Sequence, residues 1–94
     1  MINISAKAKQ VATNNGFYVE YGTTEIEYNG MTIDATTIEI SEENTDFLVI
    51  YVFMPHGKTE LYLCPDYVQG LPDTITSTRQ LTKIVEYIIS NYND

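Results

Sequence analysis

The Asn29-Gly30 dipeptide constrains the fold more than any other feature of this sequence. It stands between two runs in which apolar and polar residues alternate, 24–28 and 31–35. Asn and Gly accept the positive φ angles that a type I′ turn needs at both central positions, so the pattern predicts a β-hairpin with a two-residue loop. Such a loop fixes four cross-strand pairs: Tyr28–Met31, Glu27–Thr32, Ile26–Ile33 and Glu25–Asp34. One face of this hairpin is then apolar, and the other carries three carboxylates.

The other segments predict an α+β domain in which an N-terminal and a C-terminal helix flank an antiparallel sheet of four to five strands, in the order α-β-β-β-β-β-α. Apolar residues at helical spacing indicate a first helix that begins near Ile4 and stops at 14–16. We expect strands at 17–21, 24–28, 31–35, 47–54 and 59–64, with the first ending at Gly22. Residues 36–41 either continue the second hairpin strand or form another short one.

The last helix has the clearest signal. Ser77 and Gln80 have the spacing of a capping box, in which the Ser77 hydroxyl accepts the Gln80 backbone N–H and the Gln80 side chain reaches back to Ser77. The apolar residues that follow share one helical face: Leu81, Ile84, Val85, Ile88, Ile89 and Tyr92. This helix should pack across the sheet.

Residues 47–54 form an uninterrupted apolar run, which indicates a central strand covered on both faces. One face should meet the helices. The second needs another layer, a strongly curled sheet or another subunit. In the next strand, Leu61 and Leu63 are expected on one face, and Glu60, Tyr62 and Cys64 on the other.

A chain of 94 residues has room for one core, so we expect a single domain over 1–94. The first residues lack the pattern of a signal peptide, and no apolar run is long enough to span a membrane. The one cysteine, Cys64, cannot form an internal disulfide. We therefore expect a cytoplasmic protein, in the host cytoplasm if it is encoded by a phage.

Charge is the most unusual property of the composition. The chain has 13 acidic and 5 basic residues, and no Lys or Arg lies between Lys9 and Lys58. Such a surface repels nucleic acid and anionic membranes and attracts a basic protein surface. The candidate partner-binding residues are Glu25, Glu27, Asp34, Glu39, Glu42, Glu43 and Asp46. We expect Glu39 to join the acidic hairpin face and Tyr18, Tyr62 or Tyr67 to serve as aromatic anchors. The competing interpretation is an acidic surface that only maintains solubility.

Catalytic and metal-binding patterns are absent from the sequence. The single histidine, His56, falls in an expected surface turn, and Cys64 is expected to be a small buried hydrophobe. The glycines are spread one per turn, so no phosphate-binding loop is indicated. We predict no catalytic residues, no metal, no cofactor and no enzymatic activity.

Our leading hypothesis is a small non-enzymatic inhibitor whose acidic face occupies a basic, normally nucleic-acid-binding surface of another protein. In size and charge the chain is similar to the acidic inhibitors that phages carry against host defence nucleases, including anti-CRISPR and anti-restriction proteins. That resemblance implies a nuclease or CRISPR effector as the partner, with no direct contact to nucleic acid. An immunity or antitoxin-like inhibitor of a toxin is one alternative. A structural or assembly subunit that forms a homodimer through the second face of strand 47–54 is the other.

Overall fold

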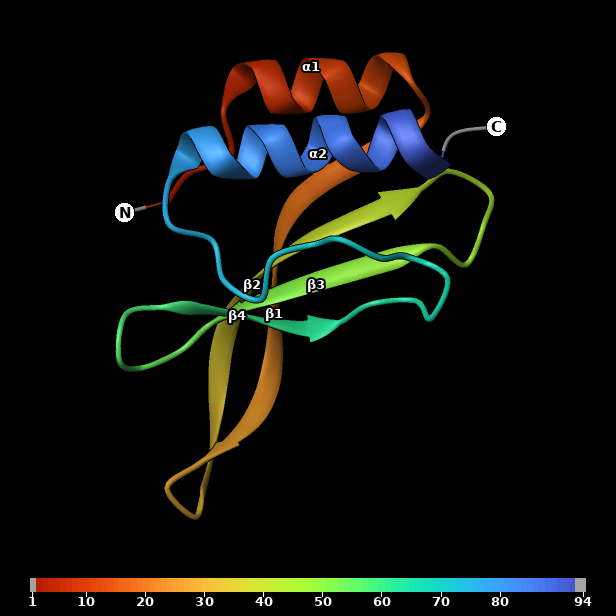
Figure 1. Ribbon diagram of the computed structural model, residues 1–94. Coiled ribbons are helices and arrows are strands. Elements are labelled where there is room, and N and C mark those ends of the chain that lie inside the picture. The colour runs from red at the N-terminus through yellow and green to blue at the C-terminus, as the bar shows by residue number, and fades with distance from the viewer. Residues whose placement is uncertain (1, 93–94) are drawn as a thin grey trace.

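The computed structural model describes residues 2–92 and has an α+β fold (Figure 1). The elements of this part of the chain are, in order, α1 (Ala6–Asn14), β1 (Phe17–Tyr28), β2 (Met31–Glu42), β3 (Leu48–Phe53), β4 (Thr59–Leu63) and α2 (Thr78–Tyr92). The strands of the described residues form one antiparallel sheet in the order β1-β2-β3-β4. The predicted fold class and the two flanking helices are therefore confirmed, with four strands in place of the five written in the expected order.

The strand number differs because β1 and β2 are longer than expected. Gly22 does not end the first strand, since pairing continues without a break from Phe17↔Glu42 to Tyr28↔Met31. Residues 36–41 continue β2. At the hairpin tip, Asn29 and Gly30 have φ angles of 52° and 79°, as a type I′ turn requires. All four predicted cross-strand pairs of the hairpin are confirmed.

Side-chain caps define the starts of both helices. The Ser5 Oγ accepts the Ala8 N–H at 3.0 Å, and the Ser77 Oγ accepts the Gln80 N–H at 3.1 Å. The second half of the predicted capping box is wrong, because the Gln80 side chain does not return to Ser77. Its Oε1 accepts the backbone N–H of Thr76 at 2.5 Å and the Thr76 hydroxyl at 2.8 Å. Thr76 gives both its N–H and its hydroxyl to this one oxygen, whereas a capping box uses only the backbone N–H of the cap residue.

The main core lies between the helices and one face of the sheet, which we call the covered face. Figure 1 shows α1 and α2 side by side on this face. Its fully buried side chains include Ala8, Ala12, Phe17, Ile38, Ile40, Val49, Tyr51, Leu81, Val85 and Ile88. Of the apolar stripe predicted for α2, the first four residues are buried as expected and Ile89 is partly buried, while the Tyr92 side chain is not among those described. None of the helices within residues 2–92 is long and apolar enough to cross a membrane.

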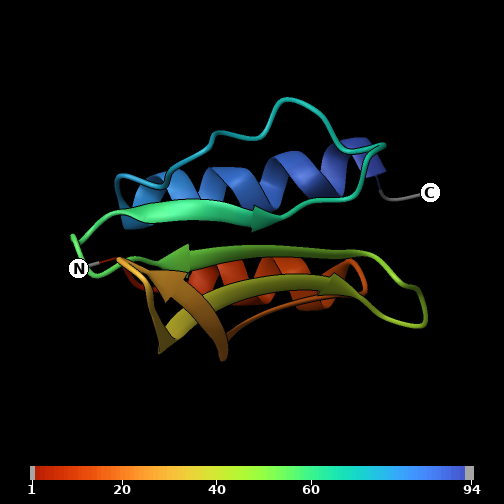
Figure 2. The same ribbon diagram turned by 90° about the horizontal axis from the view of Figure 1, so that it is seen from below.

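A second, smaller cluster lies on the opposite face of the sheet, which we call the open face. It is formed by Ile26, Ala35 and Val52, with Ile33 and Met54 packed against it. The apolar positions of β2 change sides along the strand, since Ile33 and Ala35 point one way and Ile38 and Ile40 the other. The outer half of the hairpin therefore curls over the open face, away from the helices (Figures 1 and 2). Of the three expected solutions for the second face of β3, the curled sheet covers Val52, whereas Leu48 and Ile50 on the same face remain partly exposed.

β4 contains an irregularity that overturns one predicted pattern. Leu61 pairs with Tyr51 and Leu63 pairs with Ile50, so one extra residue is inserted between these pairs. The two leucines consequently lie on different faces, and the expectation that they share one is wrong. The outer edge of β4 is covered by the following loop, because the Leu61 N–H donates to the Asp73 carbonyl oxygen at 2.8 Å. This loop closes one edge of the sheet.

Candidate protein-binding site

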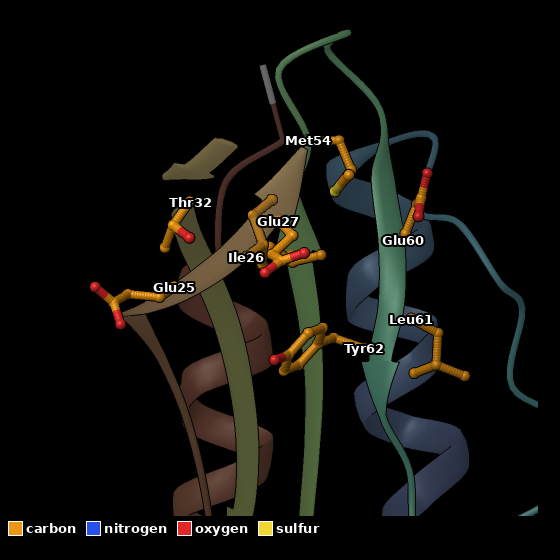
Figure 3. Close-up of a pocket in the computed structure, with 9 residues that line it drawn as sticks. Glu25, Ile26, Glu27, Thr32, Met54, Glu60, Leu61 and Tyr62 are labelled. Atoms are coloured by element: carbon orange, nitrogen blue, oxygen red, sulfur yellow. The ribbon is translucent and has the colours of Figure 1, made fainter. Parts of the chain in front are cut away.

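A groove of about 400 Å³ lies between the outer half of the hairpin and β4 (Figure 3). We call it the hairpin groove. Its lining residues are Glu25, Ile26, Glu27, Thr32, Val52, Met54, Glu60, Leu61 and Tyr62. The groove exists because β1 curls across the end of β3 and brings residues 25–27 towards residues 60–62, although β1 and β4 are at opposite edges of the sheet.

The hairpin groove combines an apolar floor with acidic and aromatic walls. Ile26 and Val52 are only 7% and 2% exposed, whereas the Tyr62 side chain is 51% exposed. In Figure 3, Glu27 lies beside Ile26 and Tyr62 extends from β4 across the space next to them. The labelled Glu25 side chain points away from this space. The lining of this groove therefore combines carboxylates and an exposed ring with buried hydrocarbon.

Glu60 stands at the rim of the groove and interacts with the preceding turn. Its Oε2 lies 3.2 Å from the Nε2 of His56, and the His56 Nδ1 accepts the Lys58 N–H at 3.3 Å. His56 thus bridges the two ends of the β3–β4 turn. This role uses both ring nitrogens and favours a structural function for the residue.

The structure separates the seven predicted partner-binding carboxylates into three places. Glu25, Glu27 and Asp34 lie on the outer half of the hairpin, and Glu25 directly faces Asp34. Glu39 lies near the middle of β2. The others lie at the end of β2 and in the turn that follows it: Glu42, Glu43 and Asp46. Asp34 and Glu42 are eight positions apart, which is roughly 26 Å along an extended strand. The seven carboxylates do not form one patch.

Glu39 does not share a face with the hairpin carboxylates, so that expectation is wrong. Side chains alternate between the two faces along a strand, and Asp34 and Glu39 are an odd number of positions apart in β2. Glu39 therefore lies on the open face and Asp34 on the opposite one. The Glu39 Oε2 accepts a hydrogen bond of 2.8 Å from the buried Thr37 hydroxyl. The same carboxylate lies across Gly22, where a Cβ atom would overlap it. Gly22 thus leaves room for the Glu39 side chain to fold back onto the sheet.

Two pairs of acidic residues are directly opposed across β1 and β2. Glu25 faces Asp34 near the hairpin tip, and Glu20 faces Glu39 on the open face. Within residues 2–92, the ion pairs join Lys7 to Glu86 at 3.7 Å and His56 to Glu60 at 3.2 Å. The seven predicted carboxylates thus take no part in an ion pair within this range. Directly opposed like charges destabilise a sheet by up to about 1 kcal/mol.

Sequence reasoning identified part of this site. Among the predicted aromatic anchors, Tyr62 lines the hairpin groove, while Tyr18 lies on the open face and Tyr67 packs near Phe47 at a ring-centroid distance of 6.4 Å. Glu60 was missed as a groove residue, and so was the opposition of Glu20 to Glu39, which lies outside the groove. The alternation of β1 could have placed Glu20 opposite Glu39 once a continuous strand was assumed. No sequence signal could have brought Glu60 towards the hairpin, because that proximity comes from the curl of the sheet.

The Cys64 thiol is poorly suited to nucleophilic chemistry. Burial, with a smaller contribution from Asp66, raises the pKa of the partly buried Cys64 thiol, so less thiolate forms at neutral pH. The Cys64 Sγ lies 3.6 Å from the Pro65 carbonyl oxygen and 3.7 Å from that of Val68. No three His, Cys, Asp or Glu residues within the described part of the chain are grouped as metal ligands.

No protein-family model, curated protein or solved structure matches this chain.

Proposed function

We propose that this chain is a small non-enzymatic inhibitor, of the kind carried by phages and mobile elements, that binds the basic surface of a nucleic-acid-binding protein. Its binding surface is the outer half of the hairpin together with the hairpin groove. The partner is a nuclease or CRISPR effector whose nucleic-acid site is rich in Lys and Arg. Occupation of that site by carboxylates excludes nucleic acid by charge and by volume.

The observation that carries this proposal is the direct opposition of Glu25 and Asp34 without a neighbouring cation. A sheet surface that serves only solubility interleaves basic residues with acidic ones. Here the hairpin retains a repulsive pair where a single Lys would relieve the repulsion. Basic side chains of a partner would relieve it on binding, so the repulsion in the free protein favours association.

The first test is capture of host or co-resident nucleases by the purified protein at about 0.05 M and 0.2 M salt, a range over which screening weakens exposed charge pairs. We expect capture of a nucleic-acid-binding protein at the lower salt, weaker capture at the higher salt and competition by DNA or RNA. Capture that is insensitive to both salt and nucleic acid would contradict charge mimicry.

The second test separates the hairpin from the general acidity of the chain. The triple variant Glu25→Lys/Glu27→Lys/Asp34→Lys changes the charge of the hairpin, and Glu42→Lys/Glu43→Lys/Asp46→Lys makes the same total change at the other end of β2. We expect the first to abolish capture and the second to retain most of it. Equal losses in both variants would show that only net charge matters.

Two other functions are distinguished by the same experiments. A captured toxin that lacks a nucleic-acid-binding site would support an immunity or antitoxin-like inhibitor, which uses the same electrostatics. A self-associating subunit is favoured by the exposed Tyr18 and Leu63 of the open face and opposed by Glu20 and Glu39 on that face. Light scattering that reports a concentration-independent monomer would exclude that alternative.

A further inference from the structure

We infer that the hairpin groove is a socket for one arginine side chain of the protein partner. This inference rests on the proposed function, because it specifies how the basic partner is held. The Glu25 carboxylate points away from the groove in Figure 3, and Asp34 is not one of the residues that line it. These two carboxylates therefore attract a basic partner without making a specific contact inside the groove. The groove itself provides the specific contact.

The floor of the groove suits the hydrocarbon part of a long side chain. Ile26 and Val52 belong to the second apolar cluster, and Met54 packs against it. An arginine side chain buries its methylene groups on apolar surface while its charged end stays near polar groups. A volume of about 400 Å³ is large enough for one such side chain and too small for a folded segment.

The walls of the groove suit the guanidinium group. Glu27 contributes a carboxylate from β1, and Tyr62 contributes an exposed ring from β4 (Figure 3). Glu60 also lines the groove, but its Oε2 interacts with the His56 Nε2 at 3.2 Å, so Glu27 is the carboxylate available to the guanidinium. The lining contains no Lys, Arg or His. A guanidinium is planar, weakly hydrated, able to stack on an aromatic ring and able to donate two parallel hydrogen bonds to a carboxylate. An ammonium group is strongly hydrated and gains less from a partly apolar site, so the groove favours arginine over lysine.

The occupant belongs to a different protein and not to a second copy of this chain. Arg79 is the only arginine in the sequence, and each copy carries a formal net charge of −8. Two copies would therefore repel each other during approach. A basic partner supplies the charge complementarity that a second copy lacks.

The test uses ¹³C-methyl NMR of the full chain titrated with N-acetyl-arginine N-methylamide. The matched probes are the corresponding citrulline derivative, which keeps the shape and loses the charge, and the lysine derivative. We expect the arginine probe to shift the methyl signals of Ile26, Val52 and Met54 at millimolar concentrations. The lysine probe should bind more weakly, and the citrulline probe should leave these signals unchanged.

Two variants that have the same net charge locate the site where the arginine probe binds. Glu27→Gln should weaken the arginine probe by about two- to fivefold, the range of a partly exposed charge pair. Glu43→Gln makes the same change in net charge far from the groove and should have no effect. The inference would be overturned if the arginine and citrulline probes shifted the methyl signals equally, or if the shifts were centred outside the groove. It would also be overturned if Glu27→Gln bound the arginine probe with full affinity.

Failure of the socket and failure of the proposed function give different results. Nuclease capture without arginine-specific shifts in the groove would overturn the socket and leave the inhibitor proposal intact. Arginine-specific shifts without capture of any nucleic-acid-binding protein would support the socket and count against that choice of partner.

Discussion

Replacement of Gly22 by alanine tests how the hairpin is attached to the sheet. A Cβ atom at residue 22 would overlap the Glu39 carboxylate and stand 2.9 Å from the Thr37 Oγ1. The Glu39 side chain must then swing away and lose its 2.8 Å hydrogen bond from the buried Thr37 hydroxyl. Leaving a buried hydroxyl without a partner costs about 1–3 kcal/mol.

Two terms decide the net change in the free energy of unfolding. Alanine is favoured over glycine inside a strand by about 0.5–1 kcal/mol, which partly offsets the lost hydrogen bond. We therefore expect Gly22→Ala to destabilise the protein by about 1 kcal/mol. In a Thr37→Ala/Glu39→Ala background neither obstructing atom remains, and the same substitution should stabilise by about 0.5 kcal/mol or more.

The assay is equilibrium urea unfolding of the four chains that form this double-mutant cycle. We expect the effect of Gly22→Ala to change sign between the two backgrounds, with a coupling energy of at least about 1.5 kcal/mol. The reasoning is refuted if Gly22→Ala has the same effect in both backgrounds. That result would mean that the Glu39 carboxylate does not occupy the space above Gly22.

Three further predictions follow from single contacts. Glu25→Lys places a cation opposite Asp34 and should stabilise the hairpin by up to about 1 kcal/mol, which slower amide exchange at the hairpin tip would report. The same variant should weaken nuclease capture. Faster amide exchange at the tip together with weaker capture would contradict the argument that Glu25 and Asp34 repel each other. Gly30→Ala forces alanine to a φ of 79° and should cost about 1–2 kcal/mol in urea unfolding, and Gly30→Asn should cost clearly less. Burial raises the pKa of Tyr51, whose hydroxyl donates to the Pro72 carbonyl oxygen at 2.7 Å, well above its usual range. The folded state then binds the phenolic proton more tightly than the unfolded state, so stability should fall as pH rises above about 10. Tyr51→Phe should make that fall shallower, and an unchanged slope would exclude this cause.

Local sequence rules were sufficient where one interaction dominates the conformation. Asn29 and Gly30 are the residues that adopt positive φ at little cost, so the turn type, the loop length and every pair of the outer hairpin could be derived before the structure was considered. The helical spacing from Leu81 to Ile88 likewise identified the buried face of α2, because an apolar stripe of that period has one stable location.

Alternation was less informative where the buried side of a strand changes. Each half of β2 has a regular period of two, and both halves were read correctly on their own. Ile33 and Ile38 nevertheless lie on opposite faces, because each half packs against a different cluster. The placement of Glu39 on the acidic hairpin face failed for this reason, and Leu61 and Leu63 were misassigned because an inserted residue reverses the alternation in β4.

The fold class, the hairpin register, the buried face of α2 and the excess of negative charge all follow from the amino-acid sequence alone. These properties depend on residues close together in the chain or on composition alone. The three-dimensional fold was needed to show that one groove is lined by Glu27, Tyr62 and Glu60. It also places three of the predicted carboxylates far from that groove: Glu42, Glu43 and Asp46. The physical reason is the curl of the sheet: burial of Ile26 and Ala35 against Val52 bends the hairpin over the open face, and that bend brings the two edges of the sheet together.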